Sequence, residues 1–147
     1  MHSVRRFVDT TMIRPESQAD EDAIWDIFHA VVASGDTYVF DPQMPREQAL
    51  AYWLRPDTHT YVAESEGQVV GTYILKPNQP ALGSHVANAS FMVTPTARGS
   101  GFGRLMGEHC LAEARRLGFR IIGTVPEAFR HSRQGFVDAY VMFQALQ

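Results

Sequence analysis

The residues with the clearest chemical potential lie in a glycine-rich turn at positions 98–103. An apolar run, Ser90–Val93, ends just before Pro95, and the turn then leads into an amphipathic segment near Phe102. A strand, a glycine turn and a helix start in this order present unpaired backbone N–H groups to an anion. Because glycine has no Cβ, a phosphate can approach the main chain closely. The pattern predicts phosphate binding, and a plain tight turn is the alternative interpretation.

This turn differs from the two commonest phosphate-binding motifs. It does not end in Gly-Lys-Ser/Thr, and its glycine spacing is not that of the dinucleotide fingerprint. Cys110, the only cysteine, falls on the apolar face of the following helix, which predicts a small core residue and not a nucleophile. The six histidines show no metal-ligand spacing, so we expect no metal site.

Length and composition indicate the class of protein. The 147 residues suffice for one domain with a full core, and 45% hydrophobic with 20% charged residues is typical of a soluble globular protein. A net charge of −3 argues against nucleic-acid binding. No apolar run approaches the ~20 residues that span a bilayer, and no signal-like stretch follows Met1–Arg6. With a single cysteine, these features predict a cytoplasmic protein.

Apolar periodicity predicts the elements that support the turn. Two helices come first, one from about Asp20 to Gly35 and one from Pro45 to Pro56. We expect strands at 12–14, 59–64, 68–75, 85–93, 120–125 and 136–143, and a helix at 103–117. A polar loop rich in Arg and His should join the last two strands. The expected fold is one mixed α/β (α+β) domain, residues 1–147, with a largely antiparallel sheet flanked by helices.

The connection between the first two helices, residues 36–42, is unusually aromatic for a loop. Loops normally run over the surface, so Tyr38 and Phe40 either pack back on the core or line a ligand pocket. The sequence leaves these two alternatives open.

Together, the motif and the order of elements resemble the GCN5-related N-acetyltransferase (GNAT) superfamily. Its central pattern, Arg/Gln-x-x-Gly-x-Gly/Ala, stands here as Arg98-Gly99-Ser100-Gly101-Phe102-Gly103. Within the superfamily, segments 35–38, 123–126 and 137–139 look like the branch that acts on small amines and amino or imino acids. The resemblance covers nearly the whole chain.

The resemblance implies an N-acetyltransferase that uses acetyl-coenzyme A and no metal. The amides of residues 99–104 would hold the pyrophosphate, and the strand at 91–93 would align the pantetheine arm and polarise the thioester. The acetyl group would pass directly to the amine. Arg98 would brace the loop or contact a phosphate. The implied coenzyme-binding residues are Phe91, Met92, Val93, Arg98, Gly99, Ser100, Gly101, Phe102, Gly103 and Arg104.

The acceptor amine needs a base or a water relay near the thioester. His85 is a suitable residue type, but it lies at the strand start, where it could simply be solvated. Asn88 cannot act as a base, yet its amide could orient the acceptor or close a strand-edge hydrogen bond. We therefore expect catalytic roles for His85 and Asn88, and an acceptor site built from Tyr38, Phe40 and Asn88.

The chain departs from the family after its coenzyme-binding helix. Residues 116–120, Arg-Leu-Gly-Phe-Arg, run straight into the last hairpin, so one strand and one helix of the family pattern are missing. In the family, that strand forms the second wall of the cleft, and that helix commonly supplies an asparagine contact and an aromatic residue or tyrosine near the sulfur, which can act as general acid. Residues 120–125 or a partner chain, as in a homodimer, should fill the gap. We expect intact pyrophosphate recognition and weakened catalysis.

The main alternative function is a coenzyme-A-binding relative that has lost activity and serves as a binding or regulatory module. A nucleotide-binding regulatory domain is a third interpretation, but it rests only on the glycine turn, whose spacing argues against it. The near-neutral charge and the short chain favour a small amine or amino acid as the partner over a histone tail or a ribosomal protein.

Overall fold

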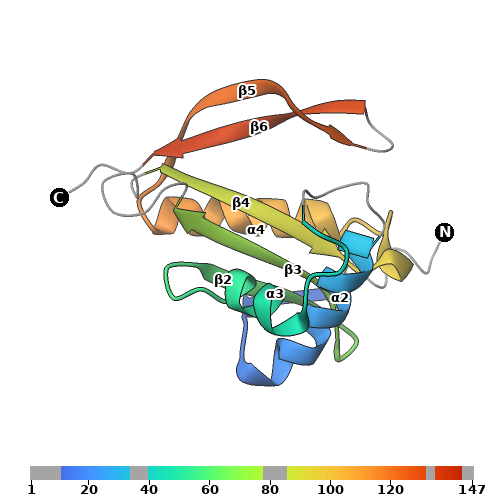
Figure 1. Ribbon diagram of the computed structural model, residues 1–147. Coiled ribbons are helices and arrows are strands. Elements are labelled where there is room, and N and C mark those ends of the chain that lie inside the picture. Colours follow the sequence, from blue (N-terminus) through green and yellow to red (C-terminus); the bar gives the residue numbers. More distant parts are fainter. Residues whose placement is uncertain (1–10, 34–39, 78–85, 132–134, 144–147) are drawn as a thin grey trace.

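The fold is a six-stranded sheet covered by helices on both faces (Figure 1). This computed structural model describes residues 11–33, 40–77, 86–131 and 135–143. Along the chain the elements are β1 (Thr11–Pro15), η1 (Gln18–Asp20), α2 (Glu21–Ala33), α3 (Arg46–Trp53), β2 (His59–Ser65), β3 (Gln68–Pro77), β4 (Val86–Val93), η3 (Pro95–Ala97), α4 (Phe102–Arg116), β5 (Arg120–His131) and β6 (Gly135–Phe143). Sheet order is β1-β2-β3-β4-β6-β5, with every neighbouring pair antiparallel. The expected fold class is confirmed.

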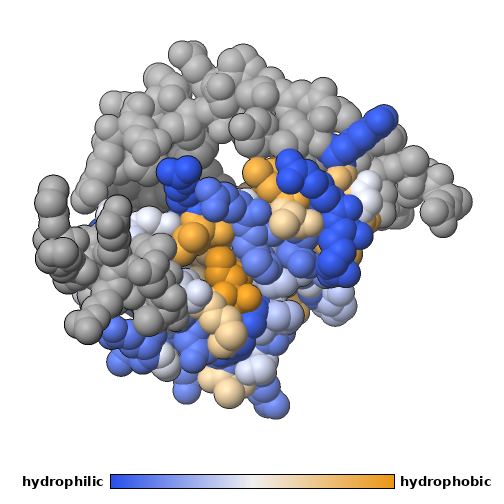
Figure 2. Space-filling view, turned by 180° about the vertical axis from the view of Figure 1, so that it is seen from behind, coloured by the Kyte–Doolittle hydropathy of each residue, from blue (hydrophilic) through white to orange (hydrophobic). Residues whose placement is uncertain are grey.

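Two apolar cores lie on the two faces of the sheet. Helices α2 and α3 cover one face, where Phe28 and Trp53 pack with Ile74 of β3. Helix α4 covers the other face, where Met106 packs with Leu75. Since successive strand residues point to opposite faces, β3 contributes to both cores. Seen from behind, the coloured surface is mostly hydrophilic, with hydrophobic residues toward its centre (Figure 2).

Helix α4 approaches the sheet closely at Gly71 of β3. A Cβ at this position would lie 3.0 Å from Cε of Met106 and 3.2 Å from the backbone oxygen of Met92. The missing side chain therefore sets how close α4 sits to β3 and β4. In the same layer Cys110 is buried, and burial raises the pKa of its thiol to about 11. This confirms the prediction of a core cysteine.

The last hairpin is longer than the sequence pattern predicts. The polar loop expected between residues 125 and 136 is wrong, because β5 continues to His131 and β6 begins at Gly135. The pairing passes from Val125↔Ala139 to Phe129↔Val137, so four steps along β5 match two along β6. This irregularity accommodates Pro126, which has no N–H for the ladder. A proline within a bulged strand looks like a loop in the sequence.

The strand beside β4 is β6, and β5 is the outer strand of the hairpin. The expectation that residues 120–125 fill the position beside β4 is therefore wrong. Strand β5 runs parallel to β4, because both are antiparallel to β6. With β6 between them, both ladders are antiparallel, which is the slightly more stable pairing.

A partly buried ion-pair cluster joins β1, η1 and β2. Arg14 donates to the two oxygens of Asp20 at 2.8 and 2.9 Å, and to Glu64 at 3.0 Å. The backbone N–H of Ser17 donates to Asp20 at 2.8 Å. Asp20 is only 5% exposed. Its hydrogen bond from Arg14 outweighs the effect of burial and lowers the pKa of the carboxyl from 3.8 to about 2.

Replacing Asp20 with Asn should lower the free energy of unfolding by about 2 kcal/mol at pH 7, because the lowered pKa measures stabilisation of the charged carboxylate. That stabilisation is present above the unfolded pKa of 3.8 and is lost as pH falls toward 2. The gap between wild type and variant should therefore close between about pH 5 and pH 2 in urea titrations. The exposed Asp26→Asn is the control, with a change within about 0.5 kcal/mol. A pH-independent gap would contradict this account.

Candidate functional site

Strands β4 and β6 pair only at one end and then diverge. Their ladder contains Val86↔Phe143 and Ala87↔Met142, whereas the opposite edge of β4 pairs with β3 from Ala87 to Val93. Figure 1 shows the two strands separating toward the carboxyl end of β4, where the glycine turn and the start of α4 lie. Residues 91–93, predicted to present main-chain groups to a ligand, lie where this separation is wide.

The glycine turn begins α4 without a side-chain cap. Gly99 and Gly101 have positive φ angles of 80° and 89°, a conformation that favours glycine. Gly101 is the N-cap residue, no described side chain caps the helix, and the first backbone bond joins the Leu105 N–H to the Gly101 oxygen at 3.1 Å. Helix geometry leaves the N–H groups of residues 102–104 without helical acceptors. They form a positive, donor-rich site for an anion.

Gly103 lies in the first turn of this helix, although neither its backbone conformation nor its surroundings require a glycine. Its φ is not positive, and a Cβ there would have no heavy atom of the described residues within 4 Å. A glycine in a helix costs about 0.5–1 kcal/mol relative to alanine. The open space in front of its backbone is what a ligand that contacts the main chain needs.

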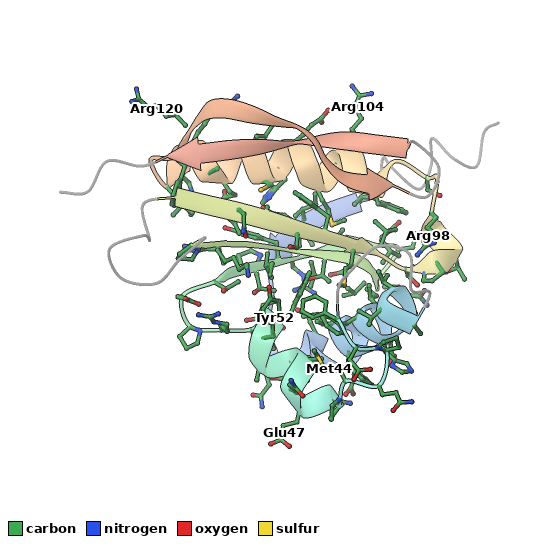
Figure 3. The ribbon with its side chains drawn as sticks, turned by 45° about the horizontal axis from the view of Figure 1, so that its top comes forward. Met44, Glu47, Tyr52, Arg98, Arg104 and Arg120 are labelled. Carbon is green, nitrogen blue, oxygen red and sulfur yellow. The ribbon has the colours of Figure 1, made fainter. Side chains whose placement is uncertain are left out.

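Two arginines place positive charge at this site. Figure 3 shows Arg98 in the loop after β4, and Arg104 projecting from the start of α4 away from the α2 and α3 layer. Within the described residues, no ion pair uses the Arg98 side chain. Arg104 is 86% exposed and pairs only with Glu108. The first turn of α4 has no acidic residue. The positive charge of Arg104 in this first turn is unfavourable for the helix dipole but favourable for an anionic ligand.

An aromatic ladder supports β4 from the α4 side. Tyr61, Tyr73 and Phe91 are direct cross-strand partners on β2, β3 and β4. Ring centroids are 4.8 Å apart for Tyr61 and Tyr73, and 5.3 Å apart for Tyr73 and Phe91. Such pairs stabilise a sheet and fix strand positions. The ladder therefore holds β4 in place at the edge from which β6 diverges.

Sequence comparison agrees with this geometry. The sequence model of the acetyltransferase (GNAT) family matches residues 21–137, which span the glycine turn and most of the sheet. The chain belongs to the GNAT family.

Known GNAT proteins match it in sequence and in structure. A GCN5-related N-acetyltransferase from Kribbella flavida is 36% identical, with a TM-score of 0.71 over 95% of this chain and 99% of that chain. N-acetyltransferase aca1 from Schizosaccharomyces pombe is 29% identical over an alignment of 105 residues, and the match covers 60% of this chain. The chain spans about half the length of that curated relative. A phosphinothricin acetyltransferase from Sinorhizobium meliloti, solved with AcCoA, shares the fold at 23% identity, a TM-score of 0.58, and coverage of 90% of this chain and 86% of that one.

The predicted coenzyme-binding residues of this GNAT chain come from three consecutive segments: the end of β4, the glycine turn and the first turn of α4. Met92 is 1% exposed, and its side chain belongs to the α2 and α3 core. Only its main chain is available to a ligand, as the prediction requires. Ser100 and Phe102 also line a hollow of about 310 Å³ beside the β2–β3 turn.

The structure describes only some of the residues predicted to form the acceptor site. His85 and Tyr38 lie outside the described residues. Phe40 packs back on the core, with ring centroids 5.3 Å from Phe28 and 5.0 Å from Tyr52, and it is only partly buried there. Asn88 is half-buried on β4, opposite Lys76 of β3, and its amide remains a candidate for orienting an acceptor.

Sequence reasoning missed the pair Lys76 and Tyr52. The Lys76 ammonium donates to the Tyr52 hydroxyl at 2.6 Å and lies 4.7 Å from the ring centroid. Figure 3 shows Tyr52 between α3 and the sheet, whereas Glu47 points away. One signal was available: Lys76 is the only lysine among 13 basic residues.

A cluster of titratable groups lies between α4 and the sheet. The hydroxyl of Tyr73 is 2.7 Å from Nδ1 of His109, and the hydroxyl of Tyr61 donates to Glu113 at 2.8 Å. Burial raises the pKa of both tyrosines. The hydrogen bond from Arg116, followed by that from Tyr61, lowers the pKa of Glu113. The tyrosines therefore stay protonated and Glu113 stays charged near neutral pH, which suits a structural network.

Among the residues that the structure describes, no group of three or more His, Cys, Asp or Glu could hold a metal ion. In the same part of the chain, no helix is both long and apolar enough to cross a membrane.

Proposed function

We propose that this GNAT chain transfers the acetyl group of acetyl-coenzyme A to the amine of a small molecule or an amino or imino acid. The observation that carries the proposal is the uncapped, glycine-begun start of α4 beside the end of β4, where β6 has diverged. A coenzyme needs both features, because its pyrophosphate is an anion and its pantetheine arm carries amides that pair with a strand edge.

The residues present fit that coenzyme. The N–H groups of residues 102–104 and the guanidinium of Arg98 would bind the pyrophosphate. Main-chain groups of Met92 and Val93 would hold the arm and one N–H would stabilise the oxyanion. The acceptor nitrogen then attacks the thioester carbon. The C–N bond forms first and gives a tetrahedral oxyanion, which that N–H stabilises. The oxyanion then collapses and the C–S bond breaks. The proton that the nitrogen loses passes through water to the leaving thiolate, which gives coenzyme A.

A second candidate function is a coenzyme-A-binding module with little or no turnover. Two features favour it. The contact between β4 and β6 is short, and the predicted acceptor residue on β4 that lies nearest to Phe91 is an asparagine. This residue is Asn88, and an amide cannot take up a proton at neutral pH. Acetyl transfer would then depend on water or on a group outside the described residues, and we expect a low rate.

Calorimetric titration with acetyl-coenzyme A followed by a thiol-release assay separates these functions. We expect saturable 1:1 binding, and slow thiol release in the presence of small amines and amino acids. The only cysteine is buried, so background from protein thiol should be small. Binding without release for any acceptor would favour the binding module. Absence of binding would overturn both functions.

A further inference from the structure

Lys76 is an ammonium group without a counter-ion in the described structure. It is the only lysine of the chain, it is half-buried, and it stands near the end of β3. Every ion pair within the described residues uses an arginine instead. An ammonium has three donors, and the Tyr52 hydroxyl accepts one at 2.6 Å. Partial burial makes the missing negative charge costly.

The position of Lys76 places this charge on the acceptor side of β4. Lys76 and Asn88 are direct cross-strand partners, so their side chains share one face of the sheet. Ile74 and Thr72, two and four residues before Lys76, point to the core under α2 and α3. The ammonium therefore lies on that face, opposite the α4 face. Tyr52 of α3, with Phe40 packed against its ring, forms a wall beside it.

We propose that Lys76, held by Tyr52, binds a carboxylate of the acceptor, so that the substrates are amines that also carry a carboxylate. This inference rests on the proposed function and names the substrate class of the same site. Tyr52 orients the ammonium through its hydroxyl and ring face, which leaves two N–H donors for the anion. The competing explanation is that the lysine stem only packs along the Tyr52 ring.

Matched substrate pairs test this proposal. The assay compares kcat/KM for an amino acid with kcat/KM for its primary amide, over several spacings between amine and carboxylate. For at least one pair, we expect the wild-type kcat/KM for the acid to exceed that for its amide by about 10–100-fold. A hydrogen bond to a charged group contributes ~1.5–3 kcal/mol, which corresponds to a ratio of this size. Lys76→Met should bring this ratio close to one through a higher KM for the acid, and Lys76→Arg should keep most of it.

Arg55→Met is the control for loss of a nearby positive charge. Arg55 follows α3 and already pairs with Asp57 at 2.9 Å, so we expect the acid-to-amide ratio to stay as in the wild type. A merely structural Lys76 would change both members of each pair equally. An unchanged ratio in Lys76→Met would overturn the proposal.

A second measurement does not depend on turnover. Because Lys76 is the only lysine, protein with ¹³C-labelled lysine should give one lysine side-chain signal in NMR spectra. Saturable movement of that signal with an acid, but not with its amide, is the expected result. No saturable movement with any acid would overturn the carboxylate site. Titration of the same samples with acetyl-coenzyme A distinguishes failure of the carboxylate site from failure of the proposed function. An absence of coenzyme binding counts against the proposed function alone.

Discussion

Gly103→Asp should lower the affinity for coenzyme A by at least ~100-fold, about 2.7 kcal/mol, without destabilising the fold. The new carboxylate would stand in the first turn of α4, in the open space in front of the Gly103 backbone. There it would occupy the proposed pyrophosphate site and repel the phosphate charges. The same carboxylate suits the helix dipole, worth about 0.3–1 kcal/mol, and removes a helical glycine. Binding and stability should therefore change in opposite directions.

Calorimetry with coenzyme A and urea unfolding of the same samples measure the two effects. Gly107→Ala is the matched control, since Gly107 also lies in α4 and a Cβ there also has no described heavy atom within 4 Å. It should gain stability like the Gly103 variant, yet bind coenzyme A within about 3-fold of wild type, because it lies beyond the uncapped first turn. Wild-type affinity in Gly103→Asp would show that the pyrophosphate binds elsewhere.

The local elements of this fold could be read from the sequence because their signals are local. Helical spacing of Ile24, Ile27, Phe28 and Val31 defines the buried face of α2, and all four are at most 3% exposed. The β2–β3 hairpin and the glycine turn depend on short-range turn chemistry. These features need no knowledge of the remote chain.

The features that the sequence did not reveal depend on pairing between distant segments. Residues 120–125 have strand character wherever they pair, and only the assembled sheet places β6, not β5, beside β4. Lys76 and Tyr52 are 24 residues apart and meet because α3 crosses the sheet at that point. Asp20 stands at the start of the first predicted helix, and its burial depends on Arg14, which reaches it from β1.

Trp53→Ala should cause one of the largest losses of stability of any single substitution, about 4 kcal/mol. Trp53 is 0% exposed and lies between α3 and the sheet. Its indole N–H donates to the Thr72 hydroxyl at 3.0 Å, and that hydroxyl donates to the backbone carbonyl oxygen of Tyr61 at 2.8 Å. Removal leaves a cavity and a buried hydroxyl oxygen that has lost its donor. Such a loss is severe, because the whole free energy of unfolding of a domain is only about 5–15 kcal/mol.

Trp53→Phe separates the hydrogen bond from the volume. We expect a loss of about 2 kcal/mol, because the Thr72 oxygen stays buried after the indole donor is gone. The chain has two tryptophans, so each variant retains one fluorescent reporter for urea unfolding. Half-buried Trp25 provides the control, and Trp25→Phe should cost less than about 1 kcal/mol.

The Trp53 variants also connect the fold to the proposed acceptor site. Because Tyr52 precedes Trp53 on α3, a loosened α3 should release the hydroxyl that holds Lys76. In Trp53→Phe, the single lysine signal should therefore move toward its position in Tyr52→Phe, and coenzyme A should still bind at the start of α4. Equal losses in the Trp25 and Trp53 variants would contradict the central role of Trp53. An unmoved lysine signal would show that α3 does not position the ammonium.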